Sequence, residues 1–127
     1  MKLLIVDDQE AVGTIIAQVV AQGGWESIYR SDAAGISDLI RQEKVDVLLI
    51  DYFMEGRTGL DIIESLRQDG FGLPIILFSG DTAAIDANRA ARLNVLSILS
   101  KPLSIPQLRT TINQAKKSIP PQDGLSA

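Results

Sequence analysis

The 127-residue chain contains no cysteine and no histidine, and only 5% of its residues are aromatic. Without cysteine, the protein forms no disulfide, holds no metal through thiolates and has no cysteine nucleophile. The absence of histidine removes the commonest general base and the commonest zinc ligand. Any metal site in this protein must therefore be built from oxygen ligands.

The chain also lacks long hydrophobic runs and an excess of positive charge. Its apolar runs are too short to span a bilayer, and Asp7-Asp8 interrupts the N-terminal one, so we expect neither a membrane span nor a secretory leader. A net charge of -4 argues against nucleic-acid binding, because duplex affinity depends on neutralising phosphates. With 46% hydrophobic residues, the sequence predicts one folded domain, and the cytoplasm is its expected location.

Apolar segments that resemble strands alternate with segments that have helical periodicity. The segment 45–50 is apolar without interruption, which is typical of a strand buried on both faces, whereas 25–29 is weaker and reads as an edge strand. The predicted strands are 2–6, 25–29, 45–50, 74–78 and 95–99.

Helical stripes and capping residues follow each predicted strand. Val12, Ile15, Ile16 and Val19 recur at helical spacing within 9–22, and Gly23-Gly24 ends that helix. The remaining helices are predicted from a cap at Ser31 or Asp32 to about Gln42, from the capping-box pair Thr58 and Asp61 to Asp69-Gly70, over 83–92 with Asn94 as a left-handed cap, and from a second box, Ser104 and Gln107, through Ala115.

Five such units predict an α/β fold, a doubly wound five-stranded parallel sheet with five helices on its two faces. We expect the domain to cover residues 1–118. Residues 119–127 have the composition of a tail or a linker to an effector domain.

Polar residues stand at the end of four of the five predicted strands. Asp7-Asp8 follow the first, Asp51 the third, Ser79 the fourth, and Lys101-Pro102 the fifth. Taken singly, each reads as a helix cap, a turn former or a solvated loop residue. Parallel strands end at one edge of a sheet, where open α/β sheets bind their ligands, so together they predict a single site.

Electrostatics indicates what that site holds. Two carboxylates about 4–5 Å apart repel each other by roughly 3–4 kcal/mol at an effective dielectric near 20. Three of them need a compensating cation, and oxygen ligands favour Mg²⁺ or Mn²⁺. An acidic cluster with a hard divalent ion and a lysine suits a transferred phosphoryl group.

On these residues the chain resembles the receiver domain of two-component response regulators. The resemblance covers about residues 2–117 and includes D-Y-F-M-E-G-R-T-G-L-D from Asp51 to Asp61, with Met54, Gly59 and Leu60 at the familiar places. It implies a flavodoxin-like fold with strand order 2-1-3-4-5. It also implies a signalling switch that catalyses only its own phosphoryl transfer and self-dephosphorylation.

The resemblance also implies a role for each site residue. Asp51 accepts the phosphoryl group from a histidine kinase or a phosphotransfer protein. Asp8, Asp51 and the backbone carbonyl of Phe53 ligate Mg²⁺, and Asp7 acts through a metal-bound water. Ser79 and Lys101, with the Gly80 backbone, contact the phosphoryl group, and the bond before Pro102 is cis.

Three departures concern output and lifetime. Glu55 stands where the family often has proline, Ile98 stands where an aromatic switch residue is usual, and Arg109-Thr110-Thr111 lacks the charged pattern of receivers that dimerise through their fourth and fifth helices. We therefore expect another surface to contact an effector or form a phosphorylation-dependent homodimer. Phe53 and Asp81 are predicted to set the phosphoryl lifetime.

Other functions of this fold fit less well. A haloacid-dehalogenase-like phosphatase needs a second acid two residues after its nucleophile, where this chain has Phe53. A flavodoxin-like cofactor binder needs a phosphate loop after the first strand, and Asp7-Asp8 would repel that phosphate. A receiver-fold module that is never phosphorylated stays open because the aromatic switch residue is absent.

Overall fold

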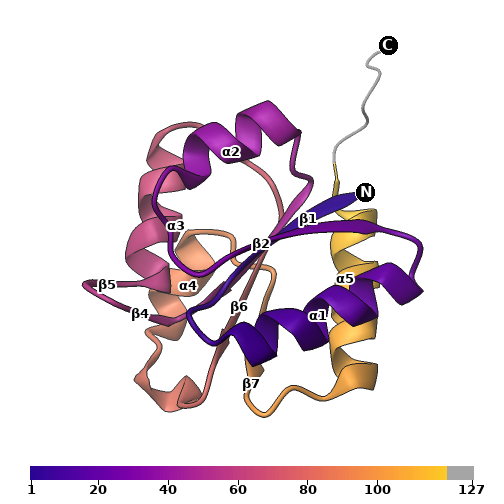
Figure 1. Ribbon diagram of the computed structural model, residues 1–127. Helices are drawn as coiled ribbons and strands as arrows, with labels where there is room; N and C mark the ends of the chain where they lie inside the picture. The colour runs from indigo at the N-terminus through magenta and orange to yellow at the C-terminus, as the bar shows by residue number, and fades with distance from the viewer. Residues whose placement is uncertain (120–127) are drawn as a thin grey trace.

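Five parallel strands form the central sheet of the computed structural model, which describes residues 1–119 (Figure 1). Their spatial order is β2-β1-β3-β6-β7, which is the predicted order 2-1-3-4-5 once the short strands β4 and β5 are set aside. The strands are β1 (Lys2–Val6), β2 (Glu26–Arg30), β3 (Val47–Asp51), β6 (Ile75–Ser79) and β7 (Ser97–Ser100).

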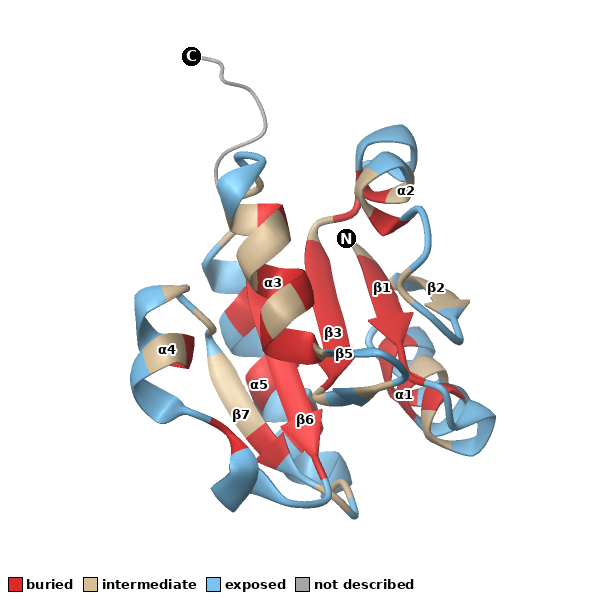
Figure 2. Ribbon diagram, turned by 90° about the vertical axis from the view of Figure 1, so that its left-hand side faces the viewer, coloured by how far each residue is buried: buried red, intermediate tan, exposed pale blue. Residues whose placement is uncertain are grey.

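Helices cover both faces of this sheet, as the alternation predicted (Figure 1). Alternate side chains of β3 point to opposite faces, with Val47 and Leu49 packed beneath α1 and α5, and Leu48 and Ile50 packed against α2, α3 and α4. All five residues of β3 and of β6 are buried, which explains their uninterrupted apolar sequences (Figure 2). The helices are α1 (Glu10–Gln22), α2 (Ile36–Glu43), α3 (Gly59–Gln68), α4 (Ala87–Arg92) and α5 (Ile105–Lys117).

Several predicted caps are present. Thr58 and Asp61 form a reciprocal capping box at the start of α3, and Asn94 has a left-handed φ of 57° after α4. Ser104 accepts a hydrogen bond from the Gln107 N–H at the start of α5, which is half of the second predicted box. These local signals therefore fix where α3 and α5 begin.

The second helix begins later than predicted. The Asp32 carboxylate accepts a hydrogen bond from the Ala34 N–H, so it forms a turn instead of capping a helix. Gly35, with a left-handed φ of 69°, is the cap, and α2 starts at Ile36. The prediction of a cap at Ser31 or Asp32 was therefore wrong.

The predicted helix 83–92 is divided into two pieces. A 3₁₀ turn, η1, covers Thr82–Ala84, and α4 begins at Ala87 after the Asp86 carboxylate caps it. Ile85 lies between them in an extended conformation with its side chain buried, because it fills the core beneath α4. Burial of this one side chain interrupts the helix.

A small antiparallel hairpin that the sequence did not suggest follows β3. It consists of β4 (Phe53–Met54) and β5 (Arg57–Thr58), with Gly56 in its turn at a φ of 81°. The hairpin lies between the end of β3 and the start of α3, at the edge of the sheet that carries the acidic residues (Figure 1). Strand β7 begins at Ser97 rather than at the predicted residue 95.

Within residues 1–119, no helix is long and apolar enough to cross a membrane. Helix α5 ends at Lys117 and is capped at Ser118. The predicted tail, apart from its first residue, lies outside the described residues, so the proposed boundary at 118 stays a prediction.

Candidate functional site

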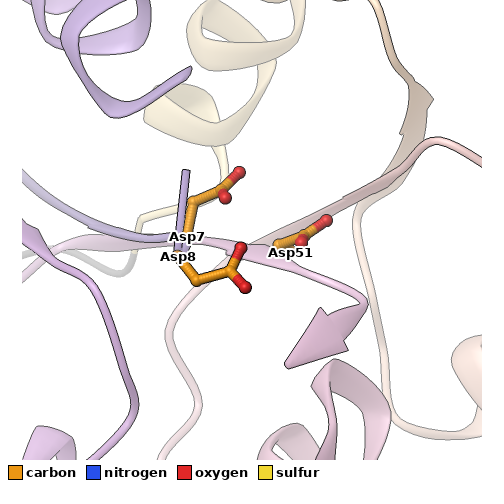
Figure 3. A group of neighbouring side chains, drawn as sticks. All are labelled: Asp7, Asp8 and Asp51. Atoms are coloured by element: carbon orange, nitrogen blue, oxygen red, sulfur yellow. The ribbon is translucent and has the colours of Figure 1, made fainter. Parts of the chain in front are cut away.

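Three carboxylates meet at the carboxyl ends of β1 and β3. Asp7, Asp8 and Asp51 each offer an oxygen, and these oxygens lie within 4.8 Å of one another (Figure 3). Asp7 and Asp51 are buried, with 0% and 4% of their surface exposed, whereas Asp8 is exposed. β1 and β3 are hydrogen-bonded neighbours, so the sheet itself brings these residues together.

Lys101 reaches into this cluster from the loop after β7. Its Nζ lies 2.9 Å from Oδ2 of Asp7 and 3.3 Å from Oδ1 of Asp51. The ammonium also lies over the ring of Phe78, whose centroid is 5.5 Å from Nζ. The Lys101 N–H donates to the Ser79 carbonyl, and the peptide bond between Lys101 and Pro102 is cis.

The pKa of Asp51 shows how far Lys101 compensates the two buried carboxylates, Asp7 and Asp51. Burial raises the pKa of the Asp51 carboxyl above its ordinary value, and the neighbouring Asp7 raises it further, while Lys101 acts in the opposite direction. The net direction is upward, so one ammonium does not fully compensate two buried carboxylates.

Asp7 is held from several sides. Its Oδ1 accepts a hydrogen bond of 2.8 Å from the Gln9 N–H, and its backbone carbonyl accepts one of 2.6 Å from the Tyr29 hydroxyl. Burial, with Asp7 close by, raises the pKa of Tyr29, which keeps that hydroxyl a donor. The Asp7 carboxylate therefore forms the turn that leads into α1 as well as part of the acidic cluster.

The backbone of Asp51 packs closely against Gly59, the first residue of α3. The Gly59 N–H donates to the Tyr52 carbonyl at 2.7 Å. A Cβ at this glycine would lie 2.6 Å from the Asp51 carbonyl oxygen, closer than real contacts allow. The lack of a side chain at position 59 lets α3 begin directly against the phosphoacceptor candidate.

The predicted hydroxyl lies at the end of β6, beside β3. Ser79 is buried, and its Oγ accepts a hydrogen bond of 3.0 Å from the Asp81 N–H. A serine hydroxyl that accepts one hydrogen bond keeps its own proton to donate. Gly80 and Asp81 are both exposed in the loop that follows.

Phe53 is predicted to set the lifetime of the phosphoryl group, and Ile98 stands at the position expected to affect output. Phe53 is 50% exposed, and its ring meets the ring of Tyr52 edge-on with centroids 4.9 Å apart. It lies in strand β4 of the hairpin. Ile98 is half-buried and packs against the core cluster that contains α3 and α4.

The residues of this cluster suit a hard divalent cation. Within residues 1–119, Oδ2 of Asp7 and Oδ1 of Asp51 are buried without a hydrogen-bond partner, and the cation that pairs with them is Lys101. All three candidate ligands are carboxylates, which Mg²⁺ and Mn²⁺ accept readily.

An open cleft of about 470 Å³ adjoins the cluster on the α1 side. It runs between the first turns of α1 and the loop that carries Lys101. Its lining is mainly apolar and consists of Gln9, Val12, Ile15, Lys101, Pro102 and Leu103.

Two residues that contact the acidic cluster or its lysine, Gln9 and Tyr29, were not predicted from the sequence. The Gln9 Oε1 accepts a hydrogen bond of 2.9 Å from Lys101 Nζ, and the Tyr29 hydroxyl binds the Asp7 carbonyl. Gln9 directly follows the acidic pair, which was the signal available for it. Tyr29 gave none, because its contact depends on the pairing of β1 with β2.

Comparison with known proteins places these observations in a family. The family model described as the response regulator receiver domain matches residues 3–113. Over 106 residues the chain is 24% identical to the probable transcriptional regulatory protein TcrX of Mycobacterium tuberculosis, covering 84% of this chain and 45% of that protein. Over 125 residues it is 27% identical to the DNA-binding transcriptional regulator NtrC of Azospirillum brasilense, covering 98% of this chain and 26% of NtrC. The chain thus spans less than half the length of these relatives.

Solved structures agree on the fold. The receiver domain of the Francisella response regulator 1452 has a TM-score of 0.82 at 24% identity, with 92% of this chain and 97% of that chain covered. The beryllofluoride-activated NtrC4 receiver domain dimer has a TM-score of 0.84 at 20% identity, with the same coverage. With a family match over nearly its whole length and an acidic edge built on the family's fold, this chain belongs to the response regulator receiver domains of two-component systems.

Proposed function

We propose that this domain is a phosphorylation-dependent switch that accepts a phosphoryl group on Asp51 from a histidine kinase or a phosphotransfer protein. One observation carries the proposal. The Asp51 carboxylate is buried at a sheet edge between two further carboxylates and the ammonium of Lys101, with one oxygen that lacks a hydrogen bond. That arrangement has no structural benefit of its own, because burying an incompletely compensated carboxylate costs stability.

The transfer is a displacement at phosphorus. A carboxylate oxygen of Asp51 forms the new O–P bond while the P–N bond to the donor imidazole breaks and the imidazole keeps the electron pair. Mg²⁺, when bound, neutralises charge on the transferred oxygens. Lys101, already within 3.3 Å of Asp51, pairs with the phosphoryl group, and the Ser79 hydroxyl and the Gly80 N–H donate to its oxygens.

The division of labour among the carboxylates supports Asp8 and Asp51 as direct ligands. Both oxygens of Asp7 are already engaged, one by the Gln9 N–H and one by Lys101. Asp8 is exposed and open to an incoming ion. Asp7 would therefore act on a bound ion indirectly, through water, and the Phe53 carbonyl, two residues after Asp51, would be the further protein ligand.

Two surfaces near the site could transmit the phosphorylation state, the α4–β7 face and the cleft beside α1. Ile98 has no polar tip to exchange between water and the interior, so we propose that the α4–β7 face changes little on phosphorylation. The apolar cleft between α1 and the loop after β7 lies directly beside the cluster, and the phosphodonor protein contacts the domain there. An effector domain or a second copy of the chain reads the result, in the cytoplasm.

Incubation with acetyl phosphate and Mg²⁺, followed by intact mass and peptide mapping, tests the assignment. We expect one added phosphate on Asp51, lost in Asp51→Asn, strongly reduced in Asp8→Ala and unchanged in the exposed control Asp69→Asn. A phosphate elsewhere, or one that persists in Asp51→Asn, would overturn the proposal. A wild-type protein that takes up none, with Mg²⁺ bound, would favour the unphosphorylated interaction module instead.

A further inference from the structure

Gln9 connects the acidic cluster to the apolar cleft. It is the cap residue of α1, but its side chain makes no capping hydrogen bond. Instead the side chain turns to Lys101, whose Nζ donates to Gln9 Oε1 at 2.9 Å. Gln9 also lines the cleft, together with Val12 and Leu103. An exposed amide thus contacts the one ammonium that balances the buried carboxylates.

The hydrogens of that ammonium can be counted. A lysine ammonium has three N–H donors, and Lys101 has three partners in reach, Asp7 at 2.9 Å, Asp51 at 3.3 Å and Gln9 at 2.9 Å. Only the contact with Gln9 is a hydrogen bond in the described part of the chain, whereas the two carboxylate oxygens hold the ammonium as ion pairs. A phosphoryl oxygen that takes a hydrogen bond from Lys101 Nζ therefore competes with Gln9 Oε1.

The cost of release differs between the partners. Asp7 is fully buried, and its Oδ2 has no hydrogen-bond partner, so withdrawal of Lys101 would leave an uncompensated charge inside the protein. Gln9 is neutral and exposed, so water replaces the ammonium at its oxygen at little cost. Asp51 itself carries the phosphoryl group, so its contact with Lys101 passes to a phosphoryl oxygen. Of the two partners that remain, Gln9 is the one that the ammonium can leave more cheaply.

We propose that Gln9 is a positioning residue that holds Lys101 before phosphorylation and is released when Asp51 becomes phosphorylated. Release frees the Gln9 side chain at the rim of the cleft, so that the cleft between α1 and the loop 101–103 changes with the state of Asp51. This inference rests on the proposed function of Asp51. It adds a route by which the phosphoryl group alters the α1 surface without the aromatic residue that the chain lacks at Ile98.

The test replaces the amide acceptor and keeps the side-chain length. Gln9→Met is compared with Gln18→Met, an exposed glutamine on the same helix. The probe is beryllofluoride with Mg²⁺, titrated by calorimetry and by two-dimensional amide spectra. Without the bond to break, Gln9→Met should bind the probe about two- to fivefold more tightly, the low end of the net worth of a hydrogen bond, because water can replace the ammonium at the exposed amide.

The spectra supply a readout that a merely structural role would not move. In wild type and in Gln18→Met, the probe should shift the amides of Val12, Ile15 and Leu103 and the side-chain resonances of Lys101. In Gln9→Met, the Lys101 resonances should differ before the probe is added, and the cleft amides should respond less on its addition.

Two outcomes overturn the inference separately. Unchanged probe affinity together with wild-type cleft shifts in Gln9→Met would show that Gln9 does not restrain Lys101, even though Asp51 is phosphorylated normally. A wild-type protein that neither binds the probe nor accepts phosphate on Asp51 would overturn the proposed function and this inference together. Peptide mapping of the phosphorylated variants distinguishes the two cases.

Discussion

Replacing Gly59 with alanine tests whether the close approach of α3 to Asp51 outweighs the higher helix propensity of alanine. Gly59 is the first residue of α3, where alanine is intrinsically favoured over glycine by up to about 1 kcal/mol. Its φ is not left-handed, so the backbone itself accepts a side chain. The added Cβ, however, would lie 2.6 Å from the Asp51 carbonyl oxygen, 2.9 Å from Leu77 Cδ1 and 3.1 Å from the Tyr52 Cα.

Two of these three contacts are to backbone atoms at the end of β3, which cannot rotate away as a side chain can. Overpacking of this kind costs about 1–3 kcal/mol, which exceeds the gain in helix propensity. We therefore expect Gly59→Ala to lower the free energy of unfolding by about 1–2 kcal/mol, and to lower the Tm by roughly 3–6 °C for each kcal/mol.

Urea unfolding followed by circular dichroism measures the stability, and timed uptake of phosphate from acetyl phosphate measures the site. Because the clash displaces the segment that carries Asp51, we expect slower phosphorylation of the folded variant as well. Gly72→Ala is the matched control, since a Cβ there meets no atom within 4 Å. A Gly59→Ala protein as stable as wild type, or more stable, would refute the argument from close approach.

Three further predictions concern charge, packing and lifetime. Burial and Asp7 raise the pKa of Asp51, so the folded protein binds this proton more tightly than the unfolded chain. Asp51→Asn should therefore be more stable than wild type without Mg²⁺ at neutral pH, and its advantage in urea unfolding should shrink as the pH falls toward 3.8. The guanidinium of Arg67 donates to the carbonyls of two residues between α3 and β6 and of two residues that directly follow α4. Arg67→Met should therefore lower the free energy of unfolding by about 2–3 kcal/mol, whereas Arg92→Met, at an exposed position, should lower it by less than about 0.5 kcal/mol. Phe53 should cover the approach of water to the acyl phosphate, so Phe53→Asn should release phosphate faster than wild type in a timed assay, and an equal rate would contradict the shielding role.

The fold was predictable because its signals are local. The three central strands, β1, β3 and β6, are short apolar runs, and a polar residue marks the end of each. Asp7 directly follows β1, Asp51 is the last residue of β3, and Ser79 is the last residue of β6. The alternation of strands with helical stripes then leaves few topologies, because parallel strands joined by helices require right-handed crossovers.

What the sequence did not predict depends on tertiary contacts. The break between η1 and α4 exists because Ile85 is drawn into the core, and no periodicity within 83–92 signals it. The late start of α2 reflects a turn made by Asp32, a residue type that suits a cap and a turn equally well. The pairing of Gln9 with Lys101 joins residues 92 positions apart, so only the assembled sheet reveals it.

The charges of the cluster explain why position 9 suits an amide. Three carboxylates and one ammonium leave a formal charge of -2, which a single divalent cation balances before a phosphoryl group approaches. On the proposed function, Lys101 compensates the buried carboxylates in the resting state and turns to the phosphoryl group when Asp51 is phosphorylated. A carboxylate as its third partner would add another like charge and, at an effective dielectric near 20, hold the ammonium by roughly 3–4 kcal/mol at 4–5 Å. Under the mechanism proposed above, a neutral glutamine holds the ammonium through one hydrogen bond that a phosphoryl oxygen can replace, so the switch would not depend on an aromatic side chain at position 98.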